Sequence, residues 1–168
     1  DGALTLNKVT VKGTSVTYAL NLPGSSDNCV VTITESNISG NIALNVWGNN
    51  TKINAIDSEF ISVDNSGDEG YAAIAFNNDG NTNCAGSVVR IEGGKIIAKD
   101  ENGEASIAVS NAANVDFQHS VNNNQTEIVG SIEVPVVLVK YAGSEQFYSC
   151  YSLQDAINTA DGAANATV

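Results

Sequence analysis

Short segments in which apolar and polar residues alternate follow one another along the first 140 residues. One kind of segment occupies residues 4–11, 31–39, 56–63 and 89–97. A second kind occupies residues 18–22, 42–46, 72–76 and 106–110. The segments are rich in Val, Ile, Leu and Thr and are bounded by Asn, Gly, Asp and Ser, which is the signature of β-strands separated by turns. The pattern predicts an all-β fold for this region.

The two kinds of segment recur with matching internal spacing, which indicates a repeat. The first kind aligns on Leu6, Ile33, Ile56 and Ile91, each with an apolar residue five positions later, namely Val11, Ile38, Ile61 and Ile96. The second kind aligns on Leu20, Leu44, Ile74 and Ile107, each followed two positions later by Leu22, Val46, Phe76 and Val109. Such alternation favours a solenoid, in which each repeat forms one coil and matching residues stack inside. A β-sandwich also has regular strands, but it does not explain the alternation.

The last part of the chain has helical spacing instead. Leu153, Ala156, Ile157 and Ala160 fall on one helical face, Ser152 can cap its start, and Gly162 follows as a stop. A helix of about nine residues is marginal alone and must dock on something. It either covers an end of the solenoid or begins a further module, and we favour the second origin.

These coils resemble the right-handed parallel β-helices of the pectin-lyase-like superfamily. Residues 151–168, YSLQDAINTADGAANATV, resemble the helical lead-in of many bacterial β-helix modules. The resemblance implies a right-handed parallel β-helix of about 4–5 coils over residues 1–140. A linker and a short C-terminal α-helix at about 152–160 would occupy residues 141–168. It also implies a secreted or cell-surface bacterial protein, but no particular reaction, because enzymes, adhesins and phage spikes share the fold.

Charge and composition narrow the function classes. The chain has 7 Lys and Arg against 19 Asp and Glu, a net charge of -12, which argues against nucleic acid or an anionic membrane surface as partner. It has no apolar run of about 18 residues, so we expect no membrane insertion. Cys29, Cys84 and Cys150 form no CxxC motif, and their disulfide status stays open, with free thiols favoured over a Cys29–Cys84 bridge.

Two carboxylates are the candidate catalytic residues. If Ile33, Ile56 and Ile91 point inward, the residues that follow them point outward, and Asp57 and Glu92 lie on adjacent coils about 5 Å apart. That separation resembles the carboxylate pair of a retaining glycosidase. The alternative is a solvated polar face, which we favour in so acidic a chain. Lyase chemistry has little support, because Arg90 is the only arginine.

Aromatic residues indicate a binding role. Trp47, Tyr71 and Phe60 are expected near strand ends and corners, where exposed rings would stack on sugars. The alternative is that Trp47 and Phe60 fill gaps between loops and core. The acidic turn at residues 64–70 offers Asp64, Asp68 and Glu69 as oxygen ligands for calcium, although a plain solvated turn is the more ordinary interpretation. No other cofactor is expected.

The sequence therefore predicts a non-enzymatic, adhesin-like or glycan-binding β-helix module from a larger surface protein. Its expected partner is a polysaccharide or a host surface protein. The alternatives are a β-helical glycoside hydrolase that uses Asp57 and Glu92, and a structural spacer that binds nothing.

Overall fold

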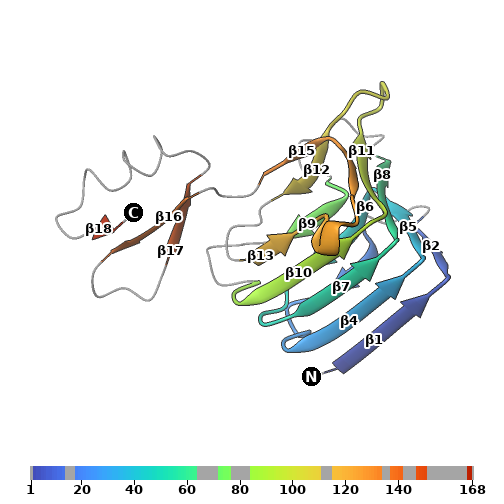
Figure 1. Cartoon of the computed structure of the whole chain (residues 1–168). Coiled ribbons are helices and arrows are strands. Elements are labelled where there is room, and N and C mark those ends of the chain that lie inside the picture. Colours follow the sequence, from blue (N-terminus) through green and yellow to red (C-terminus); the bar gives the residue numbers. More distant parts are fainter. Residues whose placement is uncertain are drawn as a thin grey trace.

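The computed structural model describes residues 2–13, 18–63, 72–76, 84–110, 115–133, 137–141, 147–150 and 166–167. Most of these residues form three five-stranded parallel sheets, shown in Figure 1. Sheet A contains β1 (Gly2–Asn7), β4 (Cys29–Thr34), β7 (Lys52–Ile56), β10 (Ser87–Glu92) and β13 (Val115–Gln118). Sheet B contains β2 (Thr10–Lys12), β5 (Asn37–Gly40), β8 (Glu59–Val63), β11 (Lys95–Lys99) and β14 (Glu127–Val129). Sheet C contains β3 (Tyr18–Leu22), β6 (Ile42–Val46), β9 (Ile74–Phe76), β12 (Ile107–Ser110) and β15 (Ser131–Ile132).

The chain passes through sheets A, B and C in turn five times, and each strand pairs in parallel with its counterparts on neighbouring passes. We call each pass a coil, so that the first coil is β1, β2 and β3 and the fifth is β13, β14 and β15. The described part of the chain is thus all-β, with one short 3-10 turn, η2 (Val121–Asn123), between β13 and β14. This topology is consistent with the predicted parallel β-helix.

Matching apolar side chains stack between the three sheets and form the core. Sheet A contributes Leu4, Val31, Ile53, Val89 and Phe117, sheet B contributes Val11, Ile38, Phe60, Ile96 and Ile128, and sheet C contributes Leu20, Leu44, Ile74, Val109 and Ile132. Most members on the three middle coils are less than 2% exposed. Parallel stacking in register puts equivalent residues of successive coils about 4.8 Å apart, which explains why the apolar pattern repeats along the sequence.

The predicted alignment is wrong by one residue in the third coil. Ala55, not Ile56, pairs with Ile33 and Ile91, and Phe60, not Ile61, pairs with Ile38 and Ile96. Ala55 is 1% exposed, whereas Ile56 is 37% exposed. Each position offers two adjacent apolar residues, so hydrophobicity alone did not distinguish them, and a slip of one residue exchanges the two faces of a strand. The spacing of five residues between the inward positions is nevertheless correct.

The fourth coil differs from the prediction in sheet C as well. Val109, not Ile107, pairs with Ile74, and the pairing of β12 with β15 shifts between Ile107 and Val109. Ile107 is half-buried and packs with Tyr18 against a smaller apolar cluster.

The three sheets end at Ile132. β16 (Val137–Tyr141) pairs antiparallel with β17 (Phe147–Cys150) and β18 (Ala166–Thr167), so residues 137–140, predicted within the β-helix domain, belong to a separate small sheet. The helix predicted at about 152–160 lies outside the described residues. Within the described part of the chain, no helix has the length and apolar character needed to cross a membrane.

Candidate functional site

The corner between sheets A and B has the same length on four coils, and on the first three it also has the same backbone form. Two residues connect the strands, and the first of them has a left-handed backbone conformation: Lys8 (φ 55°), Glu35 (φ 46°), Asp57 (φ 47°) and Gly93 (φ 66°). The second residues are Val9, Ser36, Ser58 and Gly94. Because the backbone repeats, these side chains stack in two columns along the corner. In the fourth coil Gly94 is left-handed as well (φ 67°). The left-handed residues of the first three coils are not glycine, so their turns carry charged side chains where a glycine would carry none.

Hydrogen bonds between coils hold this corner in place. The backbone N–H groups of Lys8, Glu35 and Asp57 each donate to a carbonyl of the next coil, at 2.8–3.0 Å. The buried hydroxyls of Ser36 and Ser58 each accept an N–H bond of 3.2 Å from the coil before and donate to a carbonyl of their own coil at 2.8 Å. These N–H groups of the corner are therefore satisfied within the stack, and the charged side chains do not have to bond them.

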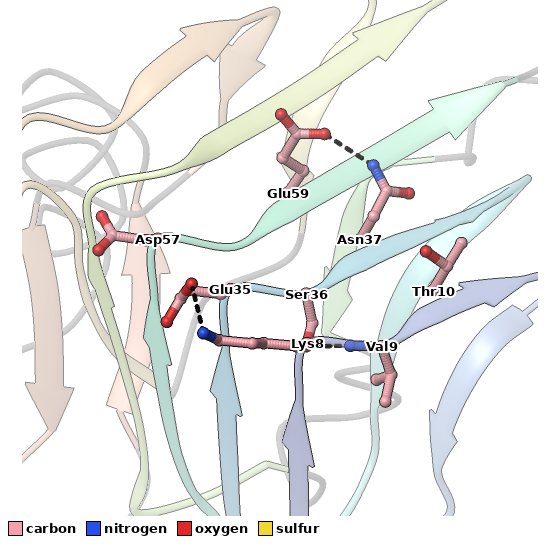
Figure 2. Close-up of a pocket in the computed structure, with 8 residues that line it drawn as sticks. All are labelled: Lys8, Val9, Thr10, Glu35, Ser36, Asn37, Asp57 and Glu59. Carbon is pink, nitrogen blue, oxygen red and sulfur yellow. Dashed lines mark hydrogen bonds and ion pairs between the residues drawn. The ribbon is translucent and has the colours of Figure 1, made fainter.

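An open hollow of about 430 Å³ follows this corner across the first three coils. We call it the corner groove, and Figure 2 shows its lining residues. They are Lys8, Val9, Thr10, Glu35, Ser36, Asn37, Asp57 and Glu59. Lys8 Nζ lies 3.3 Å from Glu35 Oε2, and Asn37 Nδ2 donates to Glu59 Oε2 at 2.7 Å. The groove thus presents an ammonium group, carboxylates, an amide and hydroxyls from successive coils.

The predicted carboxylate pair does not occupy equivalent positions. Glu92 pairs in register with Ile56, whereas Asp57 is the corner residue that follows Ile56, so the predicted outward column of Asn7, Thr34, Asp57 and Glu92 is wrong at Asp57. The two residues are still neighbours, because the Asp57 N–H donates to the Glu92 carbonyl at 2.8 Å. Their carboxylates line different hollows.

The second hollow, of about 220 Å³, lies beside the corner groove over the outer face of sheet A. Its lining residues are Asn54, Ala55, Ile56, Arg90, Glu92, Val121 and Asn122. Asn122 Nδ2 donates to Glu92 Oε2 at 2.8 Å, and Asn124 Nδ2 donates to Asp57 Oδ1 at 3.0 Å. Each candidate catalytic carboxylate therefore accepts an amide hydrogen bond from the segment around η2.

The bond between Asp57 and Asn124 passes over the fourth coil, and Gly93 provides the space for it. A methyl group at residue 93 would lie 2.5 Å from Asn124 Nδ2 and would also clash with Asp57 Oδ1. The missing side chain at residue 93 therefore allows a third-coil carboxylate to reach a fifth-coil amide.

The structure places Trp47 and Phe60 in different surroundings. Trp47 follows β6 and is half-buried, and its backbone is held by hydrogen bonds to Leu22 and Cys84 at 2.8 and 3.2 Å. Phe60 is 0% exposed and belongs to the core, so the expectation that its ring faces solvent is wrong. Successive side chains of a strand point to opposite faces, and in β8 Phe60 lies on the inner face with Ile38 and Ile96, whereas Ile61 lies on the outer face. Tyr71 lies outside the described residues.

The predicted calcium ligands Asp64, Asp68 and Glu69 also lie outside the described residues. In the part of the chain that the structure does describe, no group of three or more His, Cys, Asp and Glu residues could hold a metal ion. Cys29 and Cys84 are not joined to each other. The Cys84 thiol is buried and donates to the Val46 carbonyl at 2.9 Å.

Sequence reasoning did not find several residues of the corner. Lys8, Glu35, Asn37 and Glu59 line the groove, and Asn122 and Asn124 contact the two carboxylates. One signal was available in the sequence. Two residues separate each pair of predicted strands at this corner, and the first of the two is charged in the first three coils: Lys8, Glu35 and Asp57.

No protein-family model matches the chain, and neither the curated proteins nor the solved structures contain a significant match.

Proposed function

We propose that this chain is a non-enzymatic, glycan-binding module of the right-handed parallel β-helix type, similar to the pectin-lyase-like superfamily. It would be displayed on a bacterial surface or secreted as part of an adhesin-like protein. The observation that carries the proposal is the corner groove, whose polar groups come from three successive coils. Its hydroxyl, amide and charged groups can both donate to and accept from the hydroxyls of a sugar.

The chemistry of the groove supports recognition of hydroxyl groups over recognition of a strongly charged ligand. The Lys8 ammonium group already forms an ion pair with Glu35, with 3.3 Å between Nζ and Oε2. The Glu59 carboxylate accepts a hydrogen bond from the Asn37 amide. Thr10 and Asn37 stand in one outward column with Glu59, because Thr10 pairs with Asn37 and Asn37 pairs with Glu59. A polar side chain therefore recurs about every 4.8 Å along the coil axis, which suits a ligand that itself repeats.

A glycan array tests this proposal directly. Wild-type protein is compared with Glu59→Ala in the groove, and Glu127→Ala is the matched control, because it stands in the same column two coils away and outside the groove. We expect Glu59→Ala to weaken glycan binding and Glu127→Ala to leave it unchanged. Trp47→Ala tests the other predicted binding residue, and loss of binding in that variant alone would move the site to the corner that follows β6.

The glycoside hydrolase alternative has a separate test. Asp57→Asn and Glu92→Gln keep the amide-accepting oxygen while removing the acid, so they would abolish hydrolysis of any bound glycan and leave its binding intact. That the two carboxylates line different hollows favours the non-enzymatic reading. Wild-type binding without turnover supports the module, and a blank array at high protein concentration supports a spacer.

A further inference from the structure

The outer face of sheet B carries a column of apolar side chains. Side chains alternate between the two faces of a strand, so the residues next to the buried Phe60 and Ile96 point outward. Three successive coils have an apolar residue at the matching outward position: Ile61, Ile97 and Val129. All three are half-buried, and Val63, the next outward residue of β8, is 48% exposed. Neighbouring apolar side chains that solvent reaches commonly mark a contact surface.

A column of alternating charge runs beside the apolar column. It contains Glu59 on the third coil, Lys95 on the fourth and Glu127 on the fifth. Lys95 Nζ lies 3.3 Å from Glu127 Oε2, and these two side chains are 43% and 56% exposed. Among the described residues, none forms an ion pair with Glu59, whose carboxylate accepts a hydrogen bond from the Asn37 amide. The Glu59 carboxylate can therefore still pair with an ammonium group.

We propose that the outer face of sheet B is a two-fold interface with a second copy of the chain. The two-fold axis runs parallel to the strands, between the third and the fourth coil. The third coil of each copy then faces the fourth coil of the other, and each outward column faces the same column of the second copy. Ile61 consequently meets Ile97 of the second copy, and Glu59 meets Lys95 of the second copy. Each contact occurs twice, and the assembly closes at two copies.

The charge of this face agrees with a second copy as the partner. Its outward residues include three lysines and two glutamates: Lys12, Lys95, Lys99, Glu59 and Glu127. The whole chain has 7 basic and 19 acidic residues, so a contact through this face avoids much of the repulsion between two acidic chains. Strand propensity explains isoleucine and valine on a strand, but it does not explain opposite charges one coil apart beside them.

The size of the face predicts a weak and reversible dimer. Five strands about 4.8 Å apart, with about five residues each at about 3.3 Å per residue, cover about 400 Å². Stable complexes bury about 800 Å² on each partner, so this contact is about half of that size. The corner residues Lys8, Glu35 and Asp57 lie beside the face, so the corner groove becomes a cleft between two copies. The inference does not rest on the proposed function, because the dimer is measured without a glycan.

Charge reversal at the two facing residues is the direct test, read by analytical ultracentrifugation. Glu59→Lys places lysines opposite each other, and Lys95→Glu places glutamates opposite each other. Each change should raise the dissociation constant of the dimer at least about tenfold. The double variant Glu59→Lys/Lys95→Glu should dimerise as the wild type does. Lys52→Glu, on the outer face of sheet A, is the matched control and should leave the dissociation constant unchanged.

A mixture of the two single variants gives an independent readout. In a heterodimer of Glu59→Lys with Lys95→Glu, both facing pairs have opposite charges, so the mixture should contain dimers that neither variant forms alone. Circular dichroism confirms that each variant is folded. If a reversal prevents folding, Ile97→Thr replaces it, because threonine keeps a β-branched residue on β11 while it removes apolar contact at the interface.

Three results would overturn the proposal. The first is a wild-type chain that stays monomeric at about 500 µM. The second is a dimer whose dissociation constant is the same in the wild type, in both reversal variants and in Ile97→Thr. The third is a set of oligomers that keeps growing with concentration, since such growth requires a head-to-tail contact.

Discussion

Phe60→Ala and Ile61→Ala together test the register of the third coil. The structure buries Phe60 completely against Ile38 and Ile96, and it leaves Ile61 half-exposed on the outer face of sheet B. Truncating a fully buried phenylalanine costs about 3–5 kcal/mol, because apolar contact is lost and a cavity remains. Truncating a half-exposed isoleucine costs about 1 kcal/mol or less.

The assay is urea unfolding, followed by far-UV circular dichroism and by the fluorescence of Trp47, the only tryptophan. Domains of this size are stable by about 5–15 kcal/mol, so Phe60→Ala removes a large fraction of the free energy of unfolding. Phe60→Leu, with a smaller cavity, keeps the comparison measurable if the alanine variant does not fold.

The two possible registers predict opposite rankings. If the sequence alignment were right, Ile61 would be the buried residue, and Ile61→Ala would be the more destabilising of the two variants. Equal losses would mean that neither face of β8 is solvent-exposed. Either result would refute the register described here.

Further predictions concern the corner between sheets A and B. Gly94→Ala should lower the free energy of unfolding by at least about 2 kcal/mol, because residue 94 has a φ of 67° and its new methyl group would lie 2.6 Å from the Ser58 nitrogen. A thermal melt measures this loss. Gly24→Ala is the neutral control in that assay, because its new methyl group would have no atom within 4 Å. Ser58→Ala should cost about 1–3 kcal/mol in urea unfolding, since it removes the acceptor of the buried Ser36 N–H, whereas Ser39→Ala on the outer face should cost little. Lys8→Ala should change stability by less than about 1 kcal/mol, because both partners of its ion pair are more than half exposed; a larger loss in the same titration would show that the pair is structurally important.

The sequence predicted the periodic parts of this fold better than its exact register. Leu6 and Ile33, and likewise Leu20 and Leu44, pair as the alignment placed them. Each of these positions is the clear apolar choice within its segment. Ala55–Ile56 and Phe60–Ile61 offer two apolar neighbours, and the decision there depends on which side chain fits between the sheets.

The candidate site was less predictable because it depends on residues far apart in the sequence. Asp57 and Glu92 were found, but Asn122 and Asn124 lie 30 and 67 residues from their carboxylate partners. These groups meet only because a certain number of coils separates them and because the turns have a particular geometry. The groove residues Lys8, Asn37 and Glu59 looked like ordinary solvated positions, because only the stacking of the coils brings them into one groove.

The hydrogen bond across Gly93 changes how the stack should come apart. In a linear array, each repeat normally interacts only with its two neighbours, so the terminal repeat frays independently. Asp57 on the third coil and Asn124 beyond β13 form a second-neighbour contact that the fourth coil does not mediate. Opening the fifth coil therefore also breaks a hydrogen bond to the third coil. Local unfolding at the fifth coil consequently costs one hydrogen bond more than the pairing of neighbouring coils alone would require.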